Sequence, residues 1–227
     1  MEGIIIVNKP SGMTSHDVVD KVRHKLRMKR VGHAGTLDPL ATGVLVMLIG
    51  KATKLFSRFE NFGKAYRATL ILGMKTKTAD IEGEVISQTT ATHFTREQLE
   101  NVMKSFVGDI EQIPPMVSAV RYKGKRLYEL ARKGIEVERK ARKIKISELR
   151  LLDYAPPRAT FYLECSKGTY VRQLAEDIGQ KLGCEACIAE IKRTKVGPFE
   201  LHKAVDLQEL NAGHVQSWKE SALSLNS

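Results

Sequence analysis

The spacing of apolar residues along the chain predicts three amphipathic helices. Apolar positions three and four residues apart mark about 15–26, 95–106 and 171–182 as helical. The first two segments begin next to a Thr that has Asp17 or Gln98 three residues further on, which is the arrangement of a capping box. Two helix starts are therefore predicted from side-chain chemistry as well as from periodicity.

Strands are predicted where apolar residues form short runs or alternate with polar ones. Such patterns occur at 4–7, 44–49, 66–72, 144–146 and 161–163. Because helices and strands are mixed along a chain without repeats or low-complexity linkers, we predict one mixed α/β (α+β) domain. Its sheet should be substantially antiparallel and flanked by helices, with residues from about 85 to 145 forming a protruding subdomain.

The segment 31–43 is a loop dense in turn formers that leads into the buried strand predicted at 44–49. Pro39 fixes its own φ and disfavours helical backbone at Asp38, so we expect backbone constraints to hold this aspartate. From these residues alone two interpretations stay open. Asp38 is either a reactive carboxylate beside a rigid strand, or a turn cap accompanied by a His33 that bonds to the backbone.

Charge narrows the class of partner. The 37 Lys and Arg against 26 Asp and Glu give a formal net charge of +11, which favours nucleic acid or an anionic membrane surface. No apolar run approaches the length of a membrane span, and the N-terminus lacks the features of a secretory signal. We therefore expect a cytoplasmic protein without a membrane partner, with enough hydrophobic residues (42%) for a sizeable core.

Two runs of cations are candidate contacts to RNA phosphates. The first contains six cations and no acid: Lys21, Arg23, Lys25, Arg27, Lys29 and Arg30. The positive charges in such a run repel one another unless an anion is bound, which favours a surface that faces phosphates. The alternative is a helix face that is simply exposed to solvent. In the second run, Lys123 and Arg126 lie between Tyr122 and Tyr128, where phosphates can take the charge and bases can stack. An ordinary basic hairpin is the alternative for this second run.

The sequence offers little to hold a cofactor or a metal. It contains no phosphate-binding loop, dinucleotide glycine motif or His-Glu-x-x-His, and its 3 Cys are an odd number, which argues against a disulfide framework. Cys184 and Cys187 have the spacing of half a zinc site, but no second pair accompanies them. We therefore predict no cofactor, no metal and a reducing compartment.

Arg172 lies near the start of the helix predicted at 171–182 and outside its apolar stripe. The helix dipole disfavours a cation at that end, so Arg172 should have a carboxylate partner from elsewhere in the fold. An aspartate such as Asp38 beside a basic surface is compatible with nucleophilic or acid–base chemistry on a nucleic acid, or with binding alone.

Residues 32–43 closely resemble the catalytic signature of the TruB-type tRNA pseudouridine-55 synthases. Further segments resemble this family in the same order along the chain: 9–12, 64–66, 76–80, 114–134, 166–172 and 193–199. We accordingly assign residues 1–210 to a pseudouridine synthase-like catalytic domain with a protruding insertion. Residues 211–227 are assigned to a C-terminal tail without a complete PUA-type RNA-binding domain, and Val117 stands where relatives commonly have an aromatic residue.

The resemblance implies an isomerase that converts uridine 55 in the T loop of tRNA to pseudouridine. The base must leave its stack before the glycosidic bond is cleaved and re-formed through C5, which explains a basic cradle and aromatic side chains around one carboxylate. The implied partner is the T arm of tRNA. No cofactor is implied, and the protein is expected to act as a monomer.

By the same resemblance, Asp38 is the essential nucleophile, Tyr66 stacks on the uracil and helps to remove the C5 proton, and Arg172 pairs with the aspartate. Binding roles around this centre are implied for Lys9, His33 and Tyr170. The basic runs add four candidate contacts to RNA: Lys21, Arg23, Lys123 and Arg126.

Two other classes of protein compete with this isomerase. A non-catalytic RNA-binding or RNA-folding protein would explain the charge, but it gives no reason for Asp38 and Arg172. A retaining nucleoside hydrolase would need a second catalytic carboxylate within reach and would release free uracil.

Overall fold

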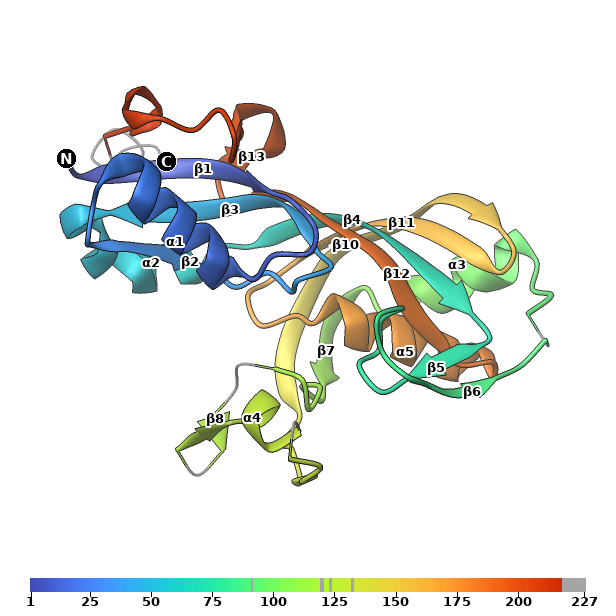
Figure 1. The fold of residues 1–227 in the computed structure, drawn as a ribbon. Coiled ribbons are helices and arrows are strands. Elements are labelled where there is room, and N and C mark those ends of the chain that lie inside the picture. The colour runs from blue at the N-terminus through green and yellow to red at the C-terminus, as the bar shows by residue number, and fades with distance from the viewer. Residues whose placement is uncertain (91, 119–120, 123, 132, 218–227) are drawn as a thin grey trace. The chain divides into compact units, whose positions relative to one another are not determined.

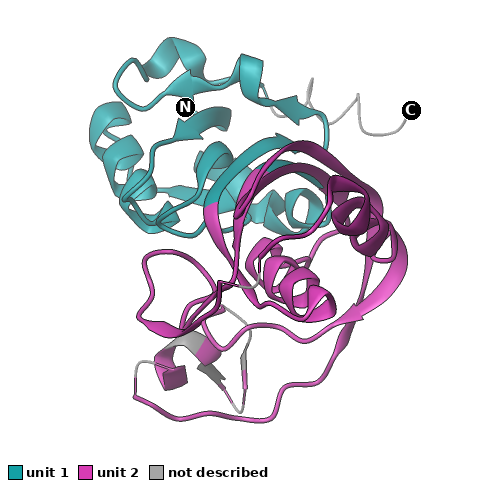
Figure 2. Ribbon diagram, turned by 90° about the vertical axis from the view of Figure 1, so that its right-hand side faces the viewer, with its two compact units in different colours: residues 1–67, 190–227 teal, residues 68–189 magenta. Residues whose placement is uncertain are grey.

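The fold is that of a computed structural model, which describes residues 1–227 except 91, 119–120, 123, 132 and 218–227 (Figure 1). The chain divides into two compact units, residues 1–67 with 190–227 and residues 68–189 (Figure 2). Two strands, β4 (Lys64–Leu72) and β12 (Ala186–Val196), each pass from one unit into the other. None of the helices in the described residues is long and apolar enough to cross a membrane.

The first unit is built on the almost entirely buried strand β3 (Thr42–Ile49). Strand β1 (Gly3–Lys9) runs antiparallel to β3 along its whole length. Strand β2 (Val31–Ala34) is antiparallel to residues 46–49 of β3, whereas β12 is parallel to residues 42–43. Since β1 occupies one edge of β3, β2 and β12 follow one another along its other edge. The connection from β2 to β3 leaves the sheet at the point between β2 and β12.

A buried apolar face fixes this register. Alternate residues of β1 and β3 pack with Phe59 and Phe199 in a cluster whose members are at most 6% exposed. A slip of one residue would turn that face of β3 to the other side of the sheet, so the pairing is strongly specified. The remaining elements of the unit, with η for 3-10 helices, are α1 (Ser15–Leu26), η1 (Gly50–Leu55), α2 (Phe56–Glu60), β13 (Phe199–Glu200), η2 (Leu201–Lys203), β14 (Val205–Asp206) and η3 (Ala212–His214).

Helix α1 begins and ends where local chemistry places its ends. The Thr14 hydroxyl accepts a hydrogen bond from the Asp17 amide (3.1 Å), and the Asp17 carboxylate accepts one from the Thr14 amide (2.8 Å). The helix ends at Arg27, whose φ of 51° is left-handed. The predicted helix at 15–26 and its capping box are confirmed.

The second unit is built on the antiparallel hairpin of β10 (Arg142–Ala155) and β11 (Arg158–Cys165). Strand β7 (Gly108–Gln112) is antiparallel to β10 as well. Helix α3 (Arg96–Lys104) packs on β10 and on α5 (Val171–Leu182). The smaller elements are β5 (Met74–Thr76), β6 (Val85–Gln88), β8 (Arg121–Tyr122), β9 (Lys125–Arg126) and α4 (Leu127–Ala131). Strands β5 and β6 form one two-stranded sheet, and β8 and β9 form another.

The predicted fold class is confirmed, because the larger sheet of this mixed α/β fold has 10 strands and is mostly antiparallel. The capping box of Thr95 and Gln98 at the start of α3 is confirmed as well. The subdomain expected at 85–145 and the division into 1–210 and 211–227 stay predictions. Among the described residues of 85–145, β7 pairs with β10 in the larger sheet, whereas β8 and β9 pair with each other in a separate two-stranded sheet.

One local prediction was wrong at the segment of most interest. Residues 31–34 form strand β2 and not the start of a loop, because their backbone groups pair with β3. Pairing with a strand that follows seven residues later outweighs the turn preference of Gly32. The true loop is therefore shorter, from residue 35 to residue 41.

Candidate active site

Residues 35–41 form the loop between β2 and β3, at the point where β12 replaces β2 beside β3. Gly43 makes this junction possible, since its φ is 99° and a Cβ there would lie 2.2 Å from the carbonyl oxygen of Arg193. A side chain at this position would force the two strands apart. The loop therefore leaves the sheet at a fixed place, and Asp38 lies at its centre.

Buried groups near the N-terminus hold the residues on both sides of Asp38. The Ser15 hydroxyl accepts a hydrogen bond from the Leu37 amide (2.8 Å) and is 3.2 Å from the Leu37 carbonyl oxygen, to which it donates. On the other side, Lys9 Nζ donates to the carbonyl oxygen of Pro39 (3.1 Å). The expectation that the backbone around Asp38 is constrained is confirmed, while Asp38 itself is partly exposed.

Lys9 ties the loop to the connection between β1 and α1. Its side chain is completely buried, and Nζ donates to the carbonyl oxygens of Pro10 (2.8 Å), Met13 (2.5 Å) and Pro39 (3.1 Å). A buried ammonium group is costly unless hydrogen bonds replace its water, and these carbonyl groups supply them. This geometry favours a role for Lys9 in positioning the loop.

Tyr66 of β4 and Arg193 of β12 belong to the same unit as this loop. Arg193 is 1% exposed, and its guanidinium donates to the carbonyl oxygens of Gly35 (3.1 Å) and Thr36 (3.2 Å). It is also hydrogen-bonded to the Tyr66 side chain, and its charge interacts with Asp38. Burial lowers the pKa of Arg193, whereas its interactions with Tyr66 and Asp38 raise it.

Arg193 was not predicted as a site residue from the sequence, where it appears only at the start of a segment that resembles the family. A signal was present in the alternation of β12, which places Arg193 on the same face as the buried Ile191. A cation at a core position of a strand is uncommon unless it is paired. That position alone could have marked Arg193 as a buried polar contact.

His33 lies on β2 and is partly buried. Burial, followed by the charge of Arg193, holds the pKa of its imidazole below the usual 6.5, so His33 is neutral at neutral pH. Its Nδ1 atom is buried and has no hydrogen-bond partner among the described residues. A neutral imidazole of this kind can still make a hydrogen bond to a ligand.

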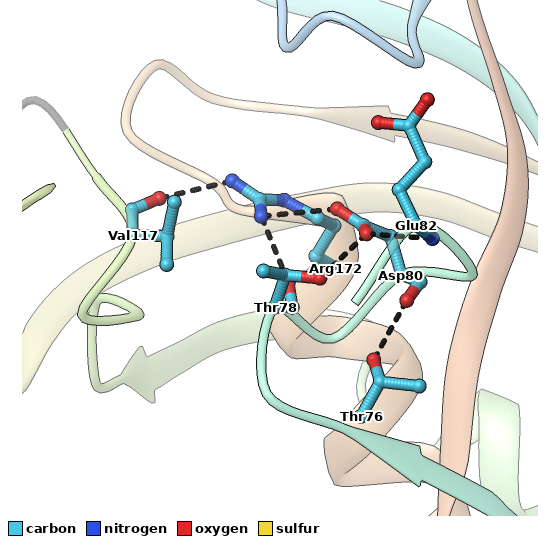
Figure 3. A network of polar contacts seen from close by, with 6 residues as sticks. All are labelled: Thr76, Thr78, Asp80, Glu82, Val117 and Arg172. Atoms are coloured by element: carbon cyan, nitrogen blue, oxygen red, sulfur yellow. Dashed lines mark hydrogen bonds and ion pairs between the residues drawn. The ribbon is translucent and has the colours of Figure 1, made fainter. Parts of the chain in front are cut away.

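In the second unit, Arg172 of α5 is 5% exposed and joins three segments (Figure 3). Its Nη1 atom donates to the Asp80 carboxylate (3.2 Å) and to the Thr78 carbonyl (2.8 Å), and Nη2 donates to the Val117 carbonyl (2.9 Å). The expectation of a carboxylate partner from elsewhere in the fold is confirmed by Asp80. The pairing of Arg172 with Asp38, which the family resemblance implies, stays a prediction.

Asp80 is itself held on several sides (Figure 3). Its Oδ1 atom accepts hydrogen bonds from the Thr78 hydroxyl (2.6 Å) and the Glu82 amide (3.2 Å), and its carbonyl accepts one from the Thr76 hydroxyl (2.7 Å). The carboxylate therefore has a fixed position next to Arg172. From the sequence, residues 76–80 are identified only as a segment that resembles the family, because nothing within it indicates a partner 92 residues away.

Tyr170 is the N-cap residue of α5 and is partly exposed. Its amide donates to Gln112 Oε1 (2.8 Å), and its carbonyl accepts from Gln112 Nε2 (3.2 Å). Gln112 is buried at the end of β7. This pair fixes the start of α5 and with it the position of Arg172.

The structure changes the expectation of a phosphate-facing surface at 21–30, because the cations of this run differ in their surroundings. Lys21 is exposed on α1. Arg23 forms an ion pair with Asp20 (2.9 Å) and donates to the Val31 carbonyl (3.2 Å). Because its charge is already partly neutralised by Asp20, Arg23 should attract an RNA phosphate less strongly than Lys21 does. Lys123 lies outside the described residues, and Arg126 is described only as backbone of β9. A shallow hollow here is lined by Asp20, Arg23, His24, Arg27, Met28 and Lys29.

Within the part of the chain that the structure describes, no group of three or more His, Cys, Asp or Glu side chains is placed to hold a metal ion. Cys165, Cys184 and Cys187 are buried free thiols. Burial raises the pKa of Cys187 to about 11, so its thiol stays protonated at neutral pH.

Comparison with known protein families and sequences gives one consistent result. Residues 23–171 match the family described as TruB family pseudouridylate synthase (N terminal domain), and residues 172–225 match the tRNA pseudouridylate synthase B C-terminal domain. The tRNA pseudouridine synthase B of Syntrophotalea carbinolica is 46% identical over 225 residues, which cover 99% of this chain and 74% of that protein. That of Symbiobacterium thermophilum is 50% identical over 216 residues, 94% of this chain and 72% of that protein.

Solved structures agree with these sequence matches. A chain in the crystal structure of a Cbf5-Nop10-Gar1 complex has a TM-score of 0.72 and 31% identity over 92% of this chain. A structure of an H/ACA RNP bound to a substrate RNA containing 2′-deoxyuridine gives a TM-score of 0.69 and 28% identity over 92% of this chain. This chain spans about half the length of those two chains, 53% and 52%.

Proposed function

This chain belongs to the TruB family of pseudouridine synthases, and we propose that it isomerises uridine 55 in the T loop of tRNA to pseudouridine. The observation that carries this proposal is that buried side chains hold the backbone of the loop 35–41 by hydrogen bonds. Buried Ser15 and Lys9 hold both neighbours of Asp38, while the aspartate stays partly exposed. A carboxylate on a constrained backbone is suited to act as a nucleophile towards a substrate that enters from solvent.

The reaction balances without a further reactant. The bond between C1′ and N1 of the uridine breaks, a bond between C1′ and C5 forms, C5 loses a proton and N1 gains one. The uridine must first be flipped out of its loop, which costs a few kcal/mol of stacking and has to be offset by contacts to the flipped base and the backbone.

In this proposal Asp38 is the nucleophile and Tyr66 stacks on the uracil. Arg172 pairs with the aspartate. His33 and Tyr170 contact the flipped nucleotide. The partly buried position of His33 on β2 and its neutral imidazole are compatible with such a contact. The partly exposed position of Tyr170 at the start of α5 is compatible with it as well.

The proposed partner is the T arm of tRNA, bound by a protein of net charge +11. We propose that the protein acts as a monomer in the cytoplasm. Three buried free thiols are compatible with such a reducing compartment.

The experiment that tests this function is release of tritium from unmodified tRNA labelled at C5 of uridine. We expect one tritium released for each pseudouridine formed, and a tRNA that carries another base at position 55 should lose the signal from that site. A non-catalytic RNA-binding protein would release no tritium. A nucleoside hydrolase would instead produce free uracil, and either result would reject the proposal.

The basic face of α1 leads to a prediction about salt. The affinity for tRNA should fall steeply with salt concentration, and Lys21→Gln should reduce the slope of log K against log salt by roughly one if Lys21 contacts a phosphate. Arg23→Gln should change the slope less, because its guanidinium is already paired with Asp20. The measurement is tRNA binding at several salt concentrations.

Lys51→Gln is a matched control for this prediction, since Lys51 lies in the same unit and 3.8 Å from Glu2. Its salt slope should equal that of the wild type. The double change Lys123→Gln with Arg126→Gln tests the second basic run in the same way. Equal slopes in the Lys21 variant and the control would show that this face of α1 does not contact phosphates.

A further inference from the structure

Arg193 is among the largest fully buried side chains of the described residues, although it carries a charge. Its three donor nitrogens each reach a different backbone carbonyl: Nε reaches Val44 (2.8 Å), Nη1 reaches Thr36 (3.2 Å) and Nη2 reaches Gly35 (3.1 Å). The guanidinium is also hydrogen-bonded to the side chain of Tyr66. One side chain therefore connects β3, the loop that carries Asp38, and β4.

Few side chains can make these contacts together. A guanidinium is planar and presents five N–H donors in fixed directions, whereas the ammonium of Lys is a single point with flexible donors. Removing such a charge from water is costly, and well-packed apolar residues commonly stabilise a fold as well as a buried charge does. The position of Arg193 is thus poorly explained by stability alone.

The backbone around Arg193 fixes where its side chain begins. Arg193 pairs with Gly43 in the parallel register of β12 and β3. Their backbones approach so closely that a Cβ on Gly43 would lie 2.2 Å from the Arg193 carbonyl oxygen, so this register requires a residue without a side chain at position 43. Strand pairing consequently places the guanidinium beside the start of the loop 35–41, independently of the conformation of the loop itself.

We propose that Arg193 is a positioning residue for the reaction, which holds the loop of Asp38 and the hydroxyl end of Tyr66 in a fixed relation to each other. This inference rests on the proposed function, because it assumes that Asp38 and Tyr66 act on one uridine. Arg193 fixes the loop through Gly35 and Thr36, while Lys9 and Ser15 hold the residues next to Asp38. Without Arg193 the loop keeps the anchors next to Asp38 but loses those at Gly35 and Thr36, where it leaves β2.

The variant Arg193→Lys tests this role because it keeps the positive charge but loses the planar guanidinium, whose N–H donors point in fixed directions. We expect the single-turnover rate of C5-tritium release to fall about 100-fold, as displacement of a catalytic group by about 1 Å can do. The affinity for tRNA should stay within about twofold of the wild type, because Arg193 is buried and does not face solvent. Lys192→Gln is the matched control, since Lys192 is the exposed neighbour on the same strand and its change should leave the rate unaltered.

A double-mutant cycle separates positioning from a merely structural role. Tyr66→Phe removes the hydroxyl that Arg193 bonds, so the combined variant Arg193→Lys with Tyr66→Phe should lose less activity than the product of the two single losses. A structural role predicts that the two losses multiply and follow the decrease in melting temperature. That outcome, or an Arg193→Lys enzyme with nearly the wild-type rate, would overturn the proposal.

Amide hydrogen exchange tests the same role without relying on activity. Arg193→Lys should accelerate exchange at residues 35–38 and leave α5, in the other unit, unchanged. If this variant does not fold, Tyr66→Phe alone should still accelerate exchange at 35–38, because the guanidinium loses one of its acceptors. Unchanged exchange would reject the positioning role, whereas a wild type with no tritium release would reject only the proposed function.

Discussion

Replacing Asp38 with Asn is expected to lower the single-turnover rate of pseudouridine formation on the order of 1000-fold or more, as loss of a catalytic nucleophile does. Asn has nearly the same volume and keeps hydrogen-bonding capacity, but it carries no negative charge that can attack carbon or pair with a guanidinium. The loop should stay folded, because its anchors at Ser15 and Lys9 bond to the backbone of Leu37 and Pro39.

The measurement combines C5-tritium release, tRNA affinity and thermal melting for wild type and Asp38→Asn. Affinity and melting temperature should change little, so that the loss appears only in the chemical step. Glu60→Gln, a carboxylate of α2 in the same unit, controls for the removal of one negative charge. A folded Asp38→Asn protein that keeps most of its activity would move this chain to the class of RNA-binding proteins.

Replacing Arg172 with Lys is expected to lower the rate about 100-fold although the charge is retained, since misplacement of a catalytic group by about 1 Å has an effect of this size. The guanidinium donates at once to Asp80, Thr78 and Val117, and it is 5% exposed. A single ammonium cannot serve three acceptors in these directions, and a buried acceptor without a partner costs about 1–3 kcal/mol.

The stability of Arg172→Lys should decrease as well, which distinguishes it from Asp38→Asn. For a chain of this size each 1 kcal/mol lowers the melting temperature by roughly 2–4 °C. Arg96→Lys is the matched control, because Arg96 forms an exposed i,i+4 ion pair with Glu100 in the same unit and should tolerate the change. Wild-type activity and melting in Arg172→Lys would show that the network of Asp80 and Arg172 has no role in catalysis.

The backbone constraint on Asp38 follows from residues within the loop itself. Pro39 restricts Asp38, and the turn formers on either side prevent a helix, so the sequence predicts a held carboxylate without knowledge of the fold. The helix ends were predictable for the same reason. Thr14 with Asp17, and Thr95 with Gln98, satisfy backbone donors only three residues away. Such interactions depend on local geometry, which the order of the residues specifies.

The tertiary structure alone determines which side chains and carbonyl groups meet around the site. Arg193 reaches Gly35 across 158 residues of sequence, and Arg172 reaches Asp80 across 92. The register of β12 against β3 selects which carbonyls a buried guanidinium meets, and the packing of a whole sheet sets that register. Lys9 illustrates the same point, since the family resemblance implies a binding role for it, yet the pairing of β1 with β3 places it among backbone carbonyls. A buried cation takes the acceptors that folding brings to it, because desolvation makes any unpaired arrangement costly.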